Sequence, residues 1–370
     1  MSNQKSVFKL LPQYYLLGIL LSKGKIQVYR GYNYIDLIFE IRFNKPNTVS
    51  LRSDNIHNIK EGKAQEMYDF LLPDIIKIWK ILETEFQKEV FLEHLPEPKR
   101  IDDFAKKIAR FVIRKIKLDN LFIRSSWGDD LTPELIKSNF LDGIPICISK
   151  LLSKTINGNL TQNDKSGIKS FLMGIADASA VIPGPESAAF GHTGTPRIQI
   201  EVDNTRWKLN LVMCLFLQKV MNVPVLNINW PHPTIKGRKG PEKVLLHNHQ
   251  FRAHAWFFKS VGFNLSIKKN NFQQLKNKIE KQFKDKQPKY CPENRKDNKF
   301  TPVKEYKLKY PKVQGLTTTP YSCSEHSENF ELLPDEIRGK HYAEFRHVCL
   351  DLGCSVVKPF FDNNYKIFNK

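Results

Sequence analysis

Three acidic residues in the second half of the chain have a spacing that suits metal-assisted chemistry on a phosphate. Asp177 ends a short apolar segment, and Glu201 and Asp203 follow where apolar and polar residues alternate. Residues two apart in a strand share a face, so the later two carboxylates point to one side. A divalent ion held by carboxylates lowers the pKa of a bound water and neutralises charge developing on a phosphodiester. If the chain is a nuclease, we predict that Asp177, Glu201 and Asp203 bind Mg²⁺, with Asp177 and Glu201 catalytic.

The first half of the chain carries a related set of residues. Asp36 and Glu40 share a strand face in the same way, and Lys23 precedes that strand. An ammonium beside a phosphate can donate a proton or bind the phosphate, so Lys23 is the third predicted catalytic residue, with Lys208 and His249 as further candidates. For all of these acids the plainer alternatives are a polar helix end or a hydrated sheet face. The chain has no GxSxG, GxxxxGK[ST] or GxGxxG motif.

Charge is the unusual feature of the composition. The 370 residues include 58 Lys and Arg against 38 Asp and Glu, which gives a net charge of +20. Hydrophobic residues make up 41% and charged residues 26%, which is ordinary for a globular protein of two or three domains. A strongly positive protein attracts polyanions, nucleic acid first and an anionic membrane surface second. The alternative is a basic surface with no particular partner.

Candidate contacts to nucleic acid gather after residue 230. A basic, glycine-rich turn at 235–240 suits a phosphate clamp, and polar residues alternate with apolar ones at 247–254, as in a strand facing a groove. The predicted contacts are Lys236, Arg238, Lys239, His247, His249, Arg252, Lys268 and Lys269. The alternative for the turn is a hydrated loop.

The elements that must position these residues occur as two similar series. Segments 14–24 and 170–180 are apolar helix candidates, each with an internal glycine, Gly18 and Gly174. Such a glycine costs ~1 kcal/mol relative to alanine, which indicates that two helices approach closely there. Each segment precedes a strand pair, a helix candidate and further strands. The expected strands are 26–29, 34–43, 196–204, 223–230 and 243–254, and the expected helices are 65–85, 101–116, 207–220 and 272–283.

Residues 172–180, Leu-Met-Gly-Ile-Ala-Asp-Ala-Ser-Ala, resemble the nine-residue LAGLIDADG signature of homing endonucleases, and residues 16–24 are a weaker second match. The resemblance covers 10–265 and implies an α+β fold of two LAGLIDADG-like αββαββα repeats. It further implies that the two motif helices pack together and that two four-stranded sheets form a saddle over the DNA major groove. In that family an acid near the end of each motif binds a divalent metal beside the scissile phosphate. Lys23 and Ser179 stand at those positions here, and Asp177 matches the earlier acid, so the resemblance supports DNA binding better than cleavage.

These observations predict a sequence-specific, metal-dependent DNA endonuclease, of the homing or restriction kind. The alternative is a non-cleaving DNA- or RNA-binding protein on the same scaffold, such as a regulator or a maturase-like splicing factor. Double-stranded DNA is the expected partner, with RNA left open, and no membrane partner is expected. Two internal repeats make a monomer sufficient, although a homodimer stays open.

The expected organisation has five parts. The first repeat spans 1–95, a helical connector 96–165 and the second repeat 166–265. A basic linker or arm at 266–320 and a small C-terminal module at 321–370 follow.

Cysteine usage and hydropathy bear on the compartment. Six cysteines in 370 residues make no disulfide framework, and the longest N-terminal apolar run, 14–21, is too short for a membrane span. We therefore expect a soluble, cytoplasmic protein without a signal peptide. Near the C-terminus, Cys323, His326, Cys349 and Cys354 are candidate ligands of a structural Zn²⁺, and buried thiols are the alternative.

Overall fold

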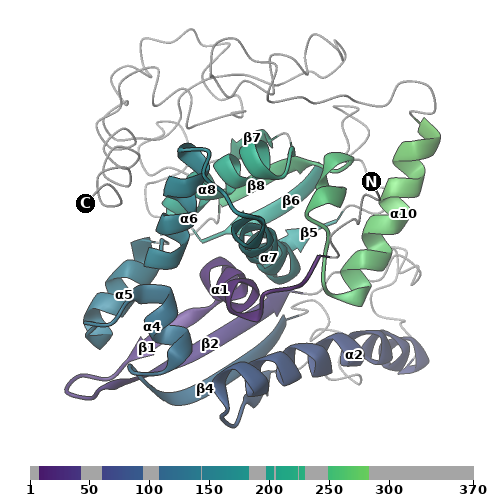
Figure 1. Cartoon of the computed structure of the whole chain (residues 1–370). Coiled ribbons are helices and arrows are strands. Elements are labelled where there is room, and N and C mark those ends of the chain that lie inside the picture. Colours follow the sequence, from purple (N-terminus) through teal and green to yellow (C-terminus); the bar gives the residue numbers. More distant parts are fainter. Residues whose placement is uncertain are drawn as a thin grey trace, which may run out of the picture.

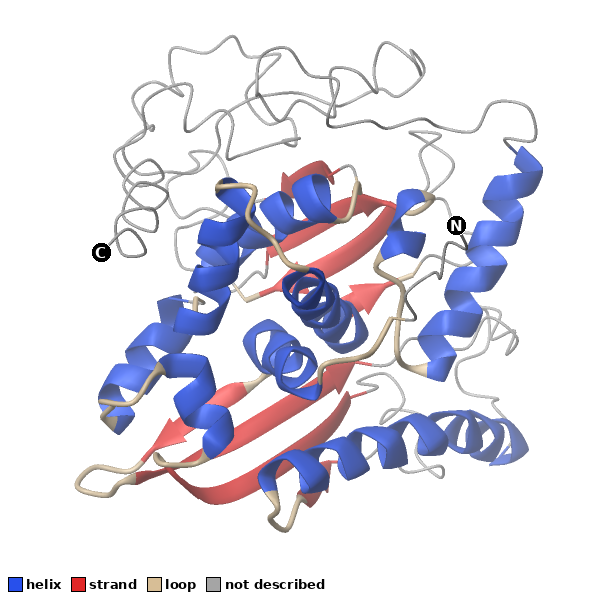
Figure 2. Cartoon of the chain, in the orientation of Figure 1, coloured by secondary structure: helices blue, strands red, loops and turns tan. Residues whose placement is uncertain are grey.

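The computed structural model describes residues 8–42, 61–94, 108–142, 144–182, 197–203, 206–223, 225–229 and 249–282. They form an α+β fold, as expected, in which helices pack on two antiparallel sheets (Figure 2). No helix in these ranges combines the length and the apolar character that crossing a bilayer requires.

The first sheet has four antiparallel strands in the order β1-β2-β4-β3. Their bounds are β1 (Lys25–Val28), β2 (Tyr34–Arg42), β3 (Phe91–His94) and β4 (Ile108–Lys117). Alternation gives β2 an apolar inner face with Phe39 and Ile41, and an outer face with Glu40 and Arg42. Helix α2 (Glu61–Phe86) lies between β2 and β3 in the chain, and it includes the whole range 65–85 that was predicted to be helical.

The second sheet has the order β5-β6-β8-β7. As in the first sheet, the second and the fourth strand along the chain pair at its centre. Its strands are β5 (Ala180–Val181), β6 (Arg197–Val202), β7 (Val225–Asn229) and β8 (His249–His254). In β6 the isoleucines Ile198 and Ile200 are buried, while Gln199 and Glu201 lie on the outer face. Helix α8 (Trp207–Leu215) continues as a π-helical turn, Phe216–Val220, before β7.

Two helices, α1 (Pro12–Lys23) and α7 (Gln162–Ser179), lie side by side at the centre, with one sheet on either side (Figure 1). Their backbones touch at the two predicted glycines. A Cβ on Gly18 would lie 2.2 Å from the carbonyl oxygen of Phe171, and a Cβ on Gly174 would lie 2.0 Å from that of Tyr15. Any side chain would push the helices apart, so both positions require glycine.

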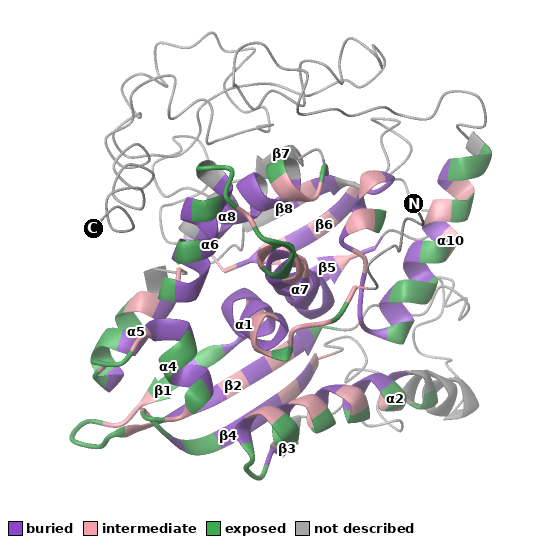
Figure 3. Ribbon diagram, viewed as in Figure 1, coloured by how far each residue is buried: buried purple, intermediate pink, exposed green. Residues whose placement is uncertain are grey.

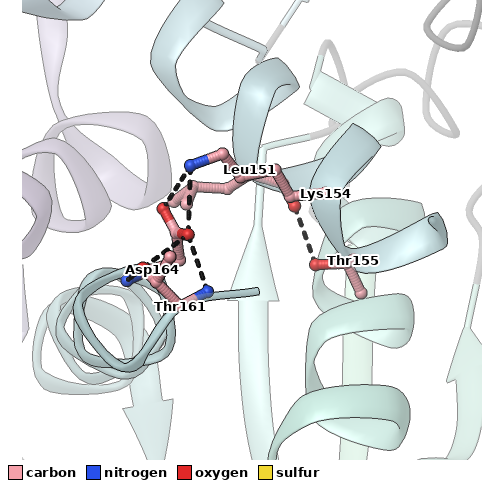
Figure 4. Close-up of polar contacts among 5 residues, drawn as sticks. All are labelled: Leu151, Lys154, Thr155, Thr161 and Asp164. Atoms are coloured by element: carbon pink, nitrogen blue, oxygen red, sulfur yellow. Dashed lines mark hydrogen bonds and ion pairs between the residues drawn. The ribbon is translucent and has the colours of Figure 1, made fainter. Parts of the chain in front are cut away.

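The start of α7 is held by a set of polar contacts (Figure 4). Thr161 and Asp164 form a capping box, in which each side chain accepts a hydrogen bond from the other residue's backbone N–H. The ammonium of Lys154, from α6 (Ile146–Ile156), lies 2.8 Å from the Asp164 carboxylate. A carboxylate at this end also complements the helix dipole.

The remaining helices cover the sides of this assembly. Helices α4 (Leu121–Trp127), α5 (Pro133–Asp142) and α6 form one group, and α10 (Ser266–Gln282) lies on the opposite side of the view in Figure 1. Figure 3 shows that buried residues run continuously through both sheets and the central helices.

One expected element is corrected by the structure, and a second is extended. Residues 108–116 were expected in a helix of the connector 96–165, but Ile108–Lys117 is the strand β4 and belongs to the first sheet. Ala109, Phe111 and Ile113 alternate toward the core, and pairing with β2 stabilises this period over the helical one. Residues 266–282 form α10, which confirms the helix expected at 272–283 as far as residue 282. This helix buries Ile267, Leu275 and others, so the start of the expected basic arm 266–320 belongs to the packed structure.

We predict that Gly18→Ala and Gly174→Ala each destabilise the protein by about 3 kcal/mol, because backbone atoms of the facing helix occupy the space of the new methyl group. Gly167→Ala in the same helix α7 is the matched control. Its nearest neighbour is the Tyr14 ring at 3.1 Å, which can shift, and alanine favours the helix by ~1 kcal/mol. Urea unfolding measures all three variants, and equal tolerance of the substitutions would show that the helices do not touch at these glycines.

Candidate functional site at the end of the first central helix

A pocket of about 420 Å³ opens at the C-terminal end of α1, where residues of β1, β2 and β6 meet. It lies between the two sheets, because β1 and β2 belong to the first and β6 to the second. The charged residues that line it are Lys23, Lys25, Glu40, Arg42, Glu201, Asp203 and Arg206. Three predicted site residues, Lys23, Glu201 and Asp203, are therefore brought together.

Glu201 is bound by cations from the other half of the chain. Its Oε2 accepts a hydrogen bond from Arg42 Nη1 at 2.6 Å and lies 3.6 Å from Lys23 Nζ. The side chains of Lys23 and Glu201 are 17% and 18% exposed, while that of Arg42 is 43% exposed. Burial lowers the pKa of Lys23, and the nearby carboxylate partly offsets this. The Arg42 pair links β2 of one sheet to β6 of the other, and the Lys23 pair links the end of α1 to β6.

The acids of the first sheet already have partners. Glu40 Oε1 accepts a hydrogen bond from Arg110 Nε at 2.8 Å, and it forms an ion pair with Nη2 of the same residue at 2.7 Å. Asp36 is 5% exposed and accepts from the backbone N–H of Lys115 and from the Tyr29 hydroxyl. Asp36 therefore holds the sheet together and does not face the pocket.

A divalent ion has a limited set of ligands here. Within the part of the chain that the structure describes, no three His, Cys, Asp or Glu side chains are grouped to hold a metal. Mg²⁺ needs only one or two protein carboxylates, because water and substrate oxygens complete its shell. Glu201 and Asp203 line one pocket and supply the hard oxygen donors that such a site uses. The donor set fits a two-carboxylate Mg²⁺ site.

Arg206 is a site residue that the sequence reasoning missed. It is 4% exposed and donates to the carbonyls of Leu21 at 2.6 Å and Gly24 at 2.8 Å, at the end of α1. Its guanidinium also lies 4.0 Å from the ring centroid of Phe140. Burial lowers its pKa to about 10, although Asp203 favours the charged form. Arg206 thus fixes the helix end that carries Lys23, and nothing in the local sequence indicated this contact.

Ser179, at the position of the second motif acid, is enclosed between the helices. Its hydroxyl accepts a hydrogen bond from Ser22 at 2.7 Å and donates to the Ile175 carbonyl at 3.0 Å. Both serines are fully buried. The two motif positions therefore differ, since Lys23 reaches the pocket and Ser179 does not line it.

Asp177 is fully buried and does not line the pocket. One of its oxygens accepts from the Tyr15 hydroxyl at 2.8 Å and from the backbone N–H groups of Asn264 and Leu265 at 2.9 and 3.2 Å. Burial raises the pKa of this carboxyl to about 6, and the ammonium of Lys268 opposes the rise. The structure does not bring Asp177 to Glu201, so a shared metal ion does not fit this arrangement.

Lys268, a predicted DNA contact, is also fully buried. Its ammonium donates to the carbonyls of Ala176 and Ala180 at 3.0 and 3.1 Å and so satisfies the C-terminal end of α7. Burial lowers its pKa to about 7, while Asp177 favours the charged form. In this conformation the side chain cannot reach DNA, which corrects the prediction. Its neighbour Lys269 is exposed.

The structure describes only some of the other residues that were predicted to contact DNA. Arg252 lies on β8 opposite Gln199 and is partly exposed, and His249 begins that strand. Beyond the described residues lie Lys236, Arg238, Lys239 and His247, together with the candidate zinc ligands Cys323, His326, Cys349 and Cys354. The side chain of Lys208 is likewise not described.

The outer faces of both sheets carry basic and amide side chains that are at least partly exposed. They are Lys25, Gln27, Arg42, Arg110 and Arg114 on the first sheet and Arg197, Gln199 and Arg252 on the second. Burial, together with the positive charge of Arg197, lowers the pKa of Arg252 to about 10. Two guanidinium groups close enough to repel each other favour an anionic ligand on this face.

We predict that Lys268→Met costs about 3 to 5 kcal/mol near neutral pH, because it leaves Asp177 buried without its cation. The double variant with Asp177→Asn should cost clearly less than the sum of the two single variants. The folded-state pKa of Asp177 lies above its ordinary value, so the folded protein takes up a proton as pH falls through about 6, before the unfolded chain does. The penalty of Lys268→Met should therefore shrink at pH 5. Urea unfolding of the four proteins at both pH values tests this, and strict additivity would contradict the pairing.

Comparison with known proteins gave limited matches. No protein-family model matches the chain, and no curated protein matches its sequence. Among solved structures, the chain is similar to I-SmaMI bound to uncleaved DNA target in the presence of calcium ions. The identity is 13% and the TM-score 0.33, over 75% of this chain and 93% of that chain.

Proposed function

We propose that this protein is a DNA endonuclease built of two LAGLIDADG-like repeats, which hydrolyses phosphodiester bonds with a divalent metal. The observation that carries the proposal is the pocket between the two sheets, where Glu201 and Asp203 lie beside Lys23 at the end of α1. This pocket adjoins the outer faces of both sheets, where a bound duplex would pass.

Duplex DNA binds, in this proposal, along the outer faces of the two sheets. Arginine and glutamine have the donor geometry that reads base edges in the major groove, and lysine and arginine bind phosphates. Strands β2 and β6 place such residues on the outer faces of the two sheets, including Arg42 on the first and Gln199 on the second. A net charge of +20 strengthens the attraction. Because one chain supplies both sheets, a monomer suffices.

Glu201 and Asp203 would hold the divalent ion, for which Mg²⁺ is the expected choice. Such an ion lowers the pKa of a bound water and neutralises charge on the phosphate. Lys23 lies 3.6 Å from Glu201 and is placed to bind a phosphate oxygen as a cation. Arg206 keeps the end of α1 in position for this contact.

A non-cleaving DNA- or RNA-binding protein on the same scaffold is the second candidate. The observation that favours it is the neutralisation of Glu201 by Arg42 and Lys23. Lys23 and Ser179 also replace the two acids of the motifs. This candidate keeps the outer faces as the binding surface and needs no metal.

We predict discrete, Mg²⁺-dependent fragments when the full chain is incubated with long, complex DNA, and no fragments in EDTA. Glu201→Gln should lower the rate by at least about a hundredfold, because a carboxylate ligand of the metal is lost. Asp129→Asn removes an equally short arginine–carboxylate pair, 2.6 Å to Arg124, that does not line the pocket, and this variant should cleave normally. Gel electrophoresis resolves the products.

Three results would change the proposal. Cleavage that survives Glu201→Gln would keep the enzyme and move its centre. Salt-sensitive retardation of DNA without cleavage would favour the second candidate. Neither cleavage nor retardation would contradict both.

We further predict that Arg114→Gln weakens binding of arbitrary duplex DNA at low salt several-fold. The side chain is 56% exposed on β4, and loss of one phosphate contact should lower the slope of log K against log salt concentration by about 1. Lys150→Gln, an exposed residue of α6, removes the same charge from the helical side and should leave the slope unchanged. Gel retardation at several salt concentrations measures the affinity and the salt slope of each variant. Equal slopes for the two variants would show that DNA does not bind along the outer face of the first sheet.

A further inference from the structure

Glu201 fills an anion site that belongs to the two sheets together. Two cations, Arg42 of β2 and Lys23 at the end of α1, converge on one of its carboxylate oxygens, at 2.6 and 3.6 Å. Residues 42 and 201 are 159 positions apart, so the packing of the two halves of the chain against each other brings them together. Arg42, Lys23 and Glu201 carry two positive charges for one negative charge, and Asp203, a further acid of the pocket, also attracts Lys23.

The same cations suit a phosphate. A guanidinium donates in a planar fork that matches phosphate as well as carboxylate oxygens, and an ammonium adds a point charge. Arg42 lines the pocket, and because its side chain is 43% exposed it can turn toward a ligand. Glu40, the facing acid of the first sheet, is held by Arg110 and does not compete for these cations.

We propose that a backbone phosphate of bound DNA takes the place of the Glu201 carboxylate between Arg42 and Lys23, and that the released Glu201 becomes available to a divalent ion beside Asp203. The inference rests on the proposed DNA binding. It makes Glu201 an internal substitute for phosphate that covers the site in the free protein. Because coupling is reciprocal, DNA then favours metal binding and metal favours DNA binding.

Gel retardation of an arbitrary DNA duplex tests whether phosphate replaces the Glu201 carboxylate. EDTA in the assay removes divalent metal, so that binding is measured without cleavage. Glu201→Gln removes the internal competitor, so we expect DNA to bind about fivefold tighter than to the wild type. The salt slope should also steepen, because both cations are then free for DNA. Asp129→Asn is the matched control, since it raises the net charge by the same unit and breaks a pair of the same 2.6 Å length.

Arg42→Gln separates this proposal from a merely structural ion pair. If the pair only held the sheets together, both substitutions would weaken DNA binding and lower the unfolding temperature alike. Under phosphate exchange they act in opposite directions, with DNA bound more tightly by Glu201→Gln and more weakly by Arg42→Gln. Thermal unfolding of each variant verifies that it folds.

The metal half of the proposal is measured without DNA. Calorimetric titration with Mg²⁺ should show several-fold tighter binding by Arg42→Gln than by the wild type, because the arginine no longer competes for Glu201. Equal Mg²⁺ affinity would overturn that half. If the wild type retards DNA and Glu201→Gln binds DNA no more tightly than Asp129→Asn does, phosphate does not replace Glu201. That result would overturn the exchange of carboxylate for phosphate but not the proposed DNA binding. Absence of wild-type retardation would overturn the proposed function itself.

Discussion

The contact between α1 and α7 is the constraint on which the rest of the structure depends. Gly18 and Gly174 let the two backbones touch, and this distance sets how close the two sheets come. The helices end together, where Ser22 and Ser179 share a buried hydrogen bond. The pocket beside Lys23 exists because strands of both sheets converge at that point. A side chain at either glycine would displace the helices and change every distance across the pocket.

Burying the two helices leaves their C-terminal carbonyls without water, and the chain satisfies these groups with buried cations. Arg206 binds the end of α1, and Lys268 binds the end of α7. A buried cation needs a compensating charge or a polar setting, which Asp177 provides for Lys268. Asp74 completes this region by accepting from the first backbone N–H groups of α10. Several charged residues that resemble catalytic groups in the sequence thus support the architecture.

Exposure separates the charges that stabilise the fold from those that can act on a ligand. Asp177 and Lys268 are fully enclosed and have no access to a substrate. Lys23, Arg42 and Glu201 have the same chemistry but open onto the pocket, so a phosphate or an ion can exchange with their present partners. The Arg42 side chain is 43% exposed, and an ion contact of so accessible a group has a small net energy, which makes exchange of this partner feasible. This difference is why the proposed chemistry is assigned to the pocket.

The sequence by itself determined most of the elements and the close helix contact, because period-two alternation and internal glycines are local properties. It also identified Lys23, Glu201 and Asp203, which the structure gathers in one pocket. It misassigned 108–116, where an apolar pattern suits a helix or a strand and pairing with β2 decides. Only the tertiary structure decided which charges are buried, and it alone revealed Arg206 and the pairing of Arg42 with Glu201. These contacts join residues more than 150 positions apart, and solvent exposure depends on packing that no local pattern encodes.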